Sequence, residues 1–233
     1  MTRAARLRRW LPLAGTSAGL LAWSNLVVPT LPSAPGVRTA ANVAAVSALV
    51  LAARAGGMSW TELGLGRPSW SSGARWGSAA LAVAATGYGV LIAVPAWRLL
   101  LDDPRVGAMA VGDLALRALV LIPLGTVVSE EVAFRGVLLA LAGRVLGPRS
   151  AVAVTAAVFG LWHASAARLP GSLGMSPRSG AAAVAGVVVA TGVGGLLLGW
   201  LRQRSGSLLA PLGAHLGSNS LGLLAARVAT GPV

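Results

Sequence analysis

Seven apolar blocks occupy most of this chain, and their lengths constrain its fold more than any other feature. They fall at Trp10–Leu31, Val37–Ala53, Trp76–Trp97, Leu114–Ala142, Ala151–Ala167, Ala181–Leu201 and Ser207–Ala226. Each block except the fifth is close to or above the ~20 residues that a helix needs to cross a bilayer. The fourth block exceeds one span and contains Pro123, so we expect a kink or a division there. We therefore predict an all-α polytopic membrane bundle of seven or eight transmembrane helices.

The composition excludes several other classes of protein. Only 11% of the 233 residues are charged, whereas soluble domains are about 25% charged. The chain has no cysteine and all nineteen of its positive charges are arginine, which excludes disulfides, thiolate metal sites, a cysteine nucleophile and a serine–lysine dyad. The net charge of +13 comes from arginines spaced singly at block ends rather than from one basic patch, so no nucleic-acid partner is expected.

The arginines also predict the orientation of the helices. Four arginines precede the first block and should stay in the cytoplasm under the positive-inside rule. If seven blocks alternate, eleven arginines lie inside and six outside. This favours a cytoplasmic N-terminus. Because the composition is typical of a bacterial protein, we expect an integral protein of the bacterial cytoplasmic membrane. An eighth helix would reverse the side of the C-terminus.

Polar and ionisable residues inside the blocks are few and fall in three places. The fourth block contains Ser129-Glu130-Glu131-Val132-Ala133-Phe134-Arg135, the fifth Phe159-Gly160-Leu161-Trp162-His163, and the seventh His215-Leu216-Gly217-Ser218-Asn219. An ionisable group inside a membrane span is costly, and it is a functional candidate by default. Both histidines of the protein lie in these blocks.

Helical spacing predicts the local partners of these residues. Glu131 and Arg135 are four residues apart and can form an ion pair on one helix face. Glu130 points about 100° away from Glu131, which leaves it without a local partner. Phe159 has the same spacing from His163, so its ring is expected to pack beside the imidazole.

The candidate residues share one depth in the membrane. Glu130 lies fourteen residues before Arg144, His163 fourteen after Arg149, and His215 and Asn219 eleven and fifteen after Arg204, arginines that the alternation of spans assigns to one side. At a rise of 1.5 Å per residue, all four lie roughly 16–22 Å from one membrane face. His215 and Asn219 are also four residues apart and can face a single point. We therefore predict one buried site built from three helices.

These groups suit peptide-bond hydrolysis in two ways. Glu130 and His163 can hold and deprotonate a water while His215 and Asn219 donate hydrogen bonds to an oxyanion. Glu130, His163 and His215 also have the composition of a catalytic zinc site with two histidines and one glutamate. The sequence therefore leaves two possibilities open: the reaction requires no cofactor, or it requires Zn²⁺. A proton-coupled transporter and a non-catalytic scaffold or immunity protein are the alternatives from other classes.

The three motifs resemble those of a known family. Glu130-Glu131-x-x-x-Arg135, Phe159-x-x-x-His163 and His215-x-x-x-Asn219, in this order on successive apolar helices, resemble the CAAX protease and bacteriocin-processing (CPBP, or Abi) family of intramembrane endopeptidases. The resemblance implies an all-helical fold with a buried, polar, water-filled active-site cavity in the membrane.

The resemblance also implies a role for each residue. Glu130 and His163 would activate water, and His215 and Asn219 would stabilise the oxyanion. The remaining motif residues, Glu131, Arg135 and Phe159, would be structural support. The eukaryotic branch of the family trims the last three residues of prenylated proteins, whereas bacterial members are linked to bacteriocin processing or self-immunity. Because the composition is typical of a bacterial protein, prenyl-protein processing is not expected.

The organisation follows from these assignments. We expect residues 1–233 to form a single integral membrane domain, with a catalytic core at 111–227 and less specific N-terminal helices at 1–110. The expected partners are the lipid bilayer and a peptide or protein substrate, membrane-associated substrates included. The linker Ala55–Ser72 is expected either to lie along the membrane interface as an amphipathic segment or to be an ordinary loop. Gly195 and Gly199 predict close helix packing.

Overall fold

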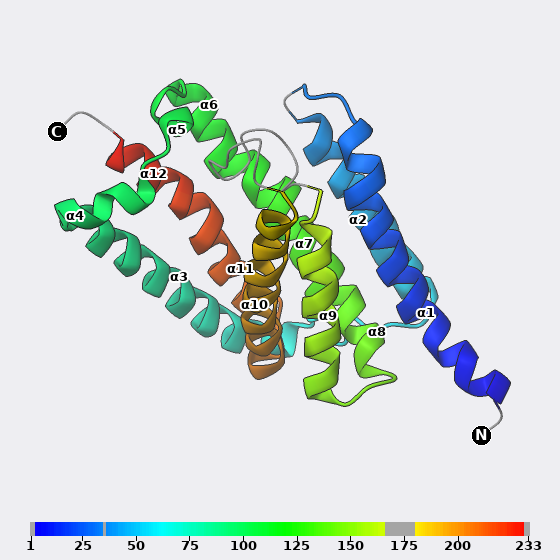
Figure 1. The fold of residues 1–233 in the computed structure, drawn as a ribbon. Helices are drawn as coiled ribbons and strands as arrows, with labels where there is room; N and C mark the ends of the chain where they lie inside the picture. The colour runs from blue at the N-terminus through cyan, green and yellow to red at the C-terminus, as the bar shows by residue number, and fades with distance from the viewer. Residues whose placement is uncertain (1–2, 35, 166–179, 231–233) are drawn as a thin grey trace.

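The computed structural model describes residues 3–34, 36–165 and 180–230, and all regular structure within these ranges is helical. The predicted all-α class is therefore confirmed. Arg168 and Arg178, which the alternation of spans assigns to the outer side, and the last residues of the fifth apolar block lie outside the described residues. Figure 1 shows the helices packed beside one another, with the fourth apolar block running through the middle of the bundle.

By length and composition, five helical stretches of the described chain can cross a membrane, which makes this an integral membrane protein. They are α1 (Arg3–Ala22) with η1 (Trp23–Val27) and η2 (Val28–Thr30), α2 (Val37–Ala55), η3 (Arg67–Ser69) with α3 (Trp70–Ala93), the stretch Val111–Gly143, and α10 (Ala181–Ser205). Short helices α4 (Pro95–Arg98), η4 (Leu99–Leu101) and α5 (Pro104–Gly107) connect α3 to Val111.

The other two apolar blocks form helices that carry both histidines. They are α9 (Pro148–Trp162), which ends next to His163, and the uninterrupted run of α11 (Leu209–Leu216), η9 (Gly217–Leu221) and α12 (Gly222–Ala229). With 15 residues α9 is short for a span, and the polar residues around His215 lower the hydropathy of the last run. The predicted count of seven or eight transmembrane helices is therefore not confirmed.

The fourth span is one helical stretch with two wide π-helical segments rather than two helices. Its parts are α6 (Val111–Leu116), η5 (Arg117–Val128), α7 (Ser129–Glu131), η6 (Val132–Leu138) and α8 (Leu139–Gly143). Pro123 lies within η5. Because proline removes one backbone donor, the expected irregularity takes the form of π turns, and such turns are frequent at functional sites. The single α-helical turn between them carries Glu130 and Glu131.

The predicted close packing at Gly195 and Gly199 is confirmed. A Cβ atom added to Gly195 would lie 3.1 Å from the Cα of Ala156, and one added to Gly199 would lie 2.9 Å from a methyl of Val152. Both neighbours belong to α9, so α9 and α10 approach each other almost backbone to backbone. This contact sets the position of the helix that leads to His163.

The linker between α2 and α3 is a turn packed against the end of the bundle. Only residues 56–66 of the predicted linker Ala55–Ser72 lie between helices, because η3 begins at Arg67 and α3 at Trp70. Met58 and Leu63 are each 1% exposed and pack with Val137 of η6. The segment is not an amphipathic helix, and its placement along the membrane interface stays a prediction.

Polar contacts hold this loop to two helices of the site region. Arg144 forms an ion pair with Glu62 at 2.7 Å, and Arg202 donates to the Glu62 carbonyl oxygen at 2.8 Å. The hydrogen bond from the Ser59 backbone N–H, followed by that from Arg144, lowers the pKa of Glu62 below its ordinary value of 4.5. The loop thus ties the ends of α8 and α10 together.

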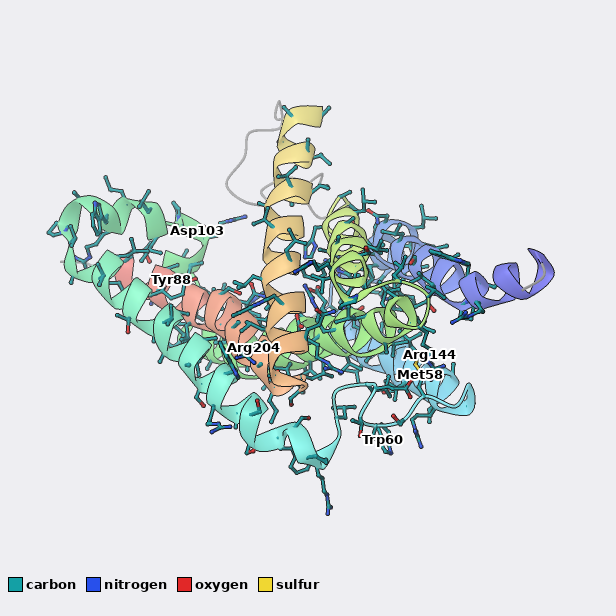
Figure 2. The ribbon with its side chains drawn as sticks, turned by 90° about the horizontal axis from the view of Figure 1, so that it is seen from below. Met58, Trp60, Tyr88, Asp103, Arg144 and Arg204 are labelled. Atoms are coloured by element: carbon teal, nitrogen blue, oxygen red, sulfur yellow. The ribbon has the colours of Figure 1, made fainter. Side chains whose placement is uncertain are left out.

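Hydrogen bonds connect arginines from four helices at this end of the bundle, where Figure 2 shows Arg144 beside Met58 of the loop. Arg9 donates to the Arg144 carbonyl oxygen at 3.0 Å, Arg54 donates to a carbonyl of the loop, and Arg202 lies beside them on Glu62. All four were assigned to one membrane side by the alternation of spans, and their contacts are consistent with that assignment. The helix α5 precedes the opposite end of the fourth span, and there Arg227 donates to the carbonyl oxygen of Gly107.

Candidate active site

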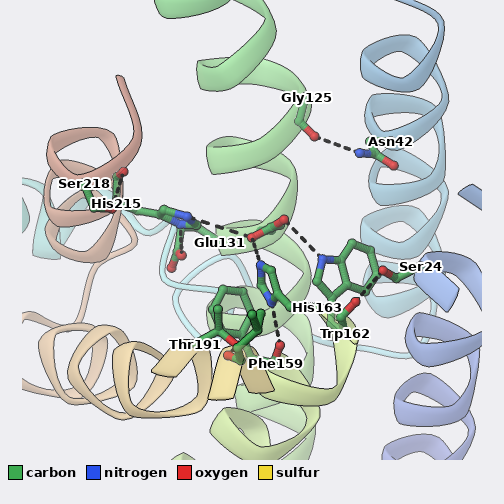
Figure 3. A network of polar contacts seen from close by, with 12 residues as sticks. Ser24, Asn42, Gly125, Glu131, Phe159, Trp162, His163, Thr191, His215 and Ser218 are labelled. Carbon is green, nitrogen blue, oxygen red and sulfur yellow. Dashed lines mark hydrogen bonds and ion pairs between the residues drawn. The ribbon is translucent and has the colours of Figure 1, made fainter. Parts of the chain in front are cut away.

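Three helices bring the candidate residues together near the centre of the bundle. Glu130 and Glu131 lie in α7 and are 7% and 0% exposed. His163 follows directly after α9, and His215 lies in α11 with an exposure of 7%. Figure 3 shows both imidazoles directed at this part of α7. The shared depth predicted from the sequence is thus found for these three helices.

The two oxygens of the Glu130 carboxylate have different surroundings. Oε2 lies 3.9 Å from Nε2 of His163 and 3.9 Å from Nε2 of His215. It is buried and has no hydrogen-bond partner among the described residues. Oε1 accepts a hydrogen bond from the indole Nε1 of Trp162 at 3.2 Å. One oxygen is therefore held, and the other is directed at both imidazoles.

The orientation of His163 is set by its own helix. Its Nδ1 lies 2.8 Å from the carbonyl oxygen of Phe159, and a carbonyl can only accept. Nδ1 therefore carries the hydrogen, and in the neutral ring Nε2 is an acceptor that faces Glu130. The predicted packing with Phe159 is confirmed, since the two rings meet edge to face with their centroids 4.7 Å apart.

A buried network orients His215. Glu131 forms the predicted ion pair with Arg135 at 3.0 Å, and the same oxygen lies 2.7 Å from Nδ1 of His215. The guanidinium of Arg135 also lies over the ring of Phe159, 4.1 Å from its centroid. The residues predicted to be structural support thus surround both histidines. The contact between Glu131 and His215 was not predicted, because residue spacing says nothing of partners on another helix.

Asn219 is the one candidate that the structure does not bring into contact with the others. It lies within the π-helical η9, which follows directly after α11 and His215. Its side chain is half-buried and has no hydrogen bond to another described residue. Its role in an oxyanion hole stays a prediction.

The three donors of the predicted zinc site are close together without forming a metal-binding group. Donor atoms about 2.0–2.2 Å from a tetrahedral Zn²⁺ lie roughly 3.4 Å from one another. Here Glu130 Oε2 lies 3.9 Å from each Nε2. Within residues 3–34, 36–165 and 180–230, no set of three His, Asp or Glu side chains is arranged to hold a metal ion. The donor types fit zinc, but their spacing does not.

Sequence reasoning missed the residues around Trp162. Its carbonyl oxygen accepts from Ser24 Oγ at 2.6 Å, and Asn25 donates to the preceding carbonyl at 3.2 Å. The available signal was an N–H donor next to His163 in an apolar block, and two polar residues near the end of the first block. Nothing in the spacing connects these two parts of the chain.

A pocket of about 360 Å³ adjoins the site between α1, α2 and α7. Its lining includes Trp23, Asn42, Ser129 and Trp162, together with glycine and aliphatic residues of α1 and α2. Glu130 does not line this pocket, since the indole of Trp162 lies at its wall. The polar, water-filled cavity expected around the site is therefore not confirmed.

Comparison with known proteins gives one match. Residues 112–221 match the family model described as Rce1-like, type II CAAX prenyl endopeptidase Rce1-like. The matched segment begins in α6 and ends with η9, so it contains all three motifs. The comparisons with curated proteins and with solved structures found no match.

Proposed function

Because residues 112–221 of this chain belong to the Rce1-like type II CAAX prenyl endopeptidase family, as the motifs predicted, we propose that the protein hydrolyses a peptide bond with water activated by Glu130 and His163. Membership indicates an intramembrane endopeptidase in general terms. The assignment of chemistry to these two residues is supported chiefly by one observation. The buried, unpartnered Oε2 of Glu130 faces the Nε2 atoms of His163 and His215 at the same distance of 3.9 Å.

The spacing of these atoms suits a water held between two acceptors. A separation of 3.9 Å is too long for a direct hydrogen bond and leaves room for a water roughly 2.8 Å from each atom. Glu130 Oε2 and the lone pair of His163 Nε2 would each accept one hydrogen of that water. Its oxygen lone pairs would then point away from both, toward a substrate carbonyl. Transfer of one proton to Glu130 yields the nucleophilic hydroxide.

The second half of the reaction concerns the oxyanion. His215 donates through Nδ1 to the Glu131 carboxylate, so a hydrogen on Nε2 gives an imidazolium whose charge Glu131 balances. That Nε2–H, together with the amide N–H of Asn219, would donate to the oxygen that becomes negative. The protonated Glu130 would then give its proton to the leaving amine. The proton that Glu130 takes from water is thus the one that it gives to the leaving amine.

Reconstitution in liposomes tests the proposal against transport and scaffolding. Wild-type protein is expected to cleave a peptide that profiling of cell membranes identifies as its substrate. His163→Ala is expected to abolish cleavage while the protein still inserts, because the water loses one of its two acceptors. Solute flux driven by a pH gradient without peptide cleavage would favour a proton-coupled transporter. Biological activity that survives His163→Ala would favour a scaffold or immunity protein.

A zinc-dependent version of the same protease is the alternative within this class. We expect purified active protein to contain no stoichiometric metal and to keep its activity in EDTA and 1,10-phenanthroline. The expectation rests on the distance between Glu130 and the two imidazoles, which exceeds that of zinc ligands. One zinc per chain, lost together with activity and restored by added Zn²⁺, would establish the metalloprotease instead.

We further propose a topology for the whole chain. Residues 1–233 form one domain of a bacterial cytoplasmic membrane with seven or eight spans and a cytoplasmic N-terminus, in which 111–227 is the catalytic core. The arginines that gather at one end of the bundle support this orientation. The core would enclose a polar cavity that admits water to Glu130.

Single cysteines test the orientation without background, because the chain has none of its own. Ala55 and Ala108 are exposed at opposite ends of the bundle. In intact cells, an impermeant maleimide is expected to label Ala108→Cys, whereas Ala55→Cys should react only after the membrane is opened. The reverse pattern would place the N-terminus outside.

A further inference from the structure

The indole of Trp162 makes the hydrogen bond that distinguishes the two oxygens of Glu130. Its Nε1 donates to Oε1 at 3.2 Å, while Oε2 is left without a partner among the described residues. Figure 3 shows this indole on the side of the site that faces α1 and α2. The Nε2 atoms of both imidazoles lie 3.9 Å from Oε2, the other oxygen of this carboxylate. Trp162 therefore approaches the Glu130 carboxylate at one oxygen and the two histidines approach it at the other.

The terminal torsion of a glutamate side chain is soft. Its energy wells are broad and roughly two-fold, so a carboxylate without fixed partners samples a range of orientations. A directional N–H donor on one oxygen restricts that range, and a bond to a charged acceptor is about twice as strong as a neutral one. The position of the donor thus determines where the free oxygen points.

We propose that Trp162 is a positioning residue for the reaction, acting through Glu130. Its indole N–H fixes Oε1, and this turns Oε2 toward the Nε2 atoms of His163 and His215, where water is activated. The inference rests on the function proposed above and adds a residue that the family motifs do not include. An indole N–H stays protonated throughout the physiological pH range, so Trp162 takes no part in proton transfer.

The indole is itself held on two sides. Its ring meets that of Phe134 edge to face, with the centroids 5.3 Å apart, and Phe134 is fully buried. Its backbone carbonyl accepts from Ser24 Oγ at 2.6 Å. The last carbonyls of a helix have no partner within the helix, so this bond stabilises the end of α9. A side chain held in this way keeps the donor in one place.

The first helix completes the support. Asn25 donates to the carbonyl of Leu161 at 3.2 Å and accepts from the backbone N–H of Ser165 at 2.9 Å. Ser165 in turn donates from its hydroxyl to the Ser24 carbonyl at 2.9 Å. These bonds enclose the turn that contains Trp162 and His163. Since Ser24 and Asn25 lie outside the matched residues 112–221, part of the chain beyond the family domain also orients the site.

The test compares two tryptophans whose indole N–H groups donate to different acceptors. Trp162→Phe removes the N–H from Glu130 and keeps an aromatic ring against Phe134. Trp23→Phe is the matched control, because Trp23 lines the same pocket and donates its indole N–H to Asn42 at 2.9 Å, without contact to Glu130. Both are assayed in liposomes with a quenched version of the peptide that profiling of cell membranes identifies.

The positioning role predicts a loss in kcat alone. For Trp162→Phe we expect kcat to fall roughly ten- to hundredfold, the usual effect of removing an outer partner of a reacting group, with KM within about twofold of wild type. Trp23→Phe should change kcat by less than about twofold. Both variants should have similar melting temperatures, since each loses one indole hydrogen bond in the same region. Equal kcat values for the two variants would overturn the proposal.

A second variant separates the hydrogen bond from the shape of the ring. Incorporation of β-(3-benzothienyl)alanine at position 162 replaces the N–H by sulfur and preserves the bicyclic ring. This variant should therefore fold even if Trp162→Phe fails to fold. The same loss of kcat is expected, and unchanged kcat would contradict the inference. Failure of the wild type to cleave, or cleavage by Glu130→Gln, would instead refute the proposed function, so the two failures are distinguishable.

Discussion

Glu130→Gln is expected to lower kcat by about a thousandfold or more while the protein still folds and inserts. Glutamine has the same shape, and its amide oxygen can still accept from Trp162, but it cannot take a proton from water. General base catalysis contributes roughly 10²–10⁴-fold in rate. Peptide cleavage by the purified variant in liposomes, with kcat and KM measured separately, gives the result. KM should stay close to the wild-type value.

Glu62→Gln is the matched control for this loss. It makes the same chemical change at a glutamate that lies in the exposed loop between α2 and α3 and pairs with Arg144. Exposed ion pairs contribute only about 0–1 kcal/mol, so Glu62→Gln should keep near wild-type activity. A Glu130→Gln variant as active as the Glu62→Gln control would exclude Glu130 as the base.

Glu131→Gln is expected to cause the largest loss of stability. The carboxylate is fully buried and is shared by Arg135 at 3.0 Å and His215 at 2.7 Å. Removing its charge leaves the buried Arg135 uncompensated, and breaking a buried ion pair in this way costs about 3–5 kcal/mol. Thermal unfolding in detergent should show a melting temperature well below that of Glu62→Gln. A change no larger than that control would contradict the account of this network.

The double variant Glu131→Gln/Arg135→Met separates the two tasks of Glu131. It removes the uncompensated cation together with the anion, so most of the lost stability should return. Activity should remain low, because His215 still lacks the carboxylate that balances its second proton. Recovery of both stability and activity would show that Glu131 acts only through Arg135, and that His215 needs no charged partner.

Contacts along a single helix could be predicted from the sequence. The pairing of Glu131 with Arg135 and the packing of Phe159 against His163 each follow from a four-residue spacing, and both are present. The counts from flanking arginines predicted one depth for the three helices, because the rise per residue is nearly constant. Each of these results needs only the spacing of residues along one helix, and the pair of Glu131 and Arg135 forms even though Arg135 lies in the π-helical η6.

Contacts between helices could not be predicted in this way. Whether His215 faces Glu131 or Glu130 depends on how α11 is rotated and tilted against α7, and no spacing within either helix records that. The indole of Trp162 reaches Glu130 from α9 for the same reason.

The number of spans shows a further limit of hydropathy. The helix α9, which ends next to His163, is short, and the helical run that contains His215 is polar, so the criterion for membrane spans does not select two of the three helices of the site. Buried polar groups lower the mean hydropathy of a span wherever they serve a function. The match to the family model covers α9 and the part of the last helical run that contains His215.

The most direct test of the central claim is a profile of peptide termini in membranes from cells that express the wild type or Glu130→Gln at equal levels. The account predicts new termini with the wild type that are absent with the variant, and those termini identify the substrates. Identical profiles, with expression and insertion verified, would contradict the assignment of the protein as an endopeptidase. They would favour a role of the buried Glu130 in transport or in a non-catalytic scaffold.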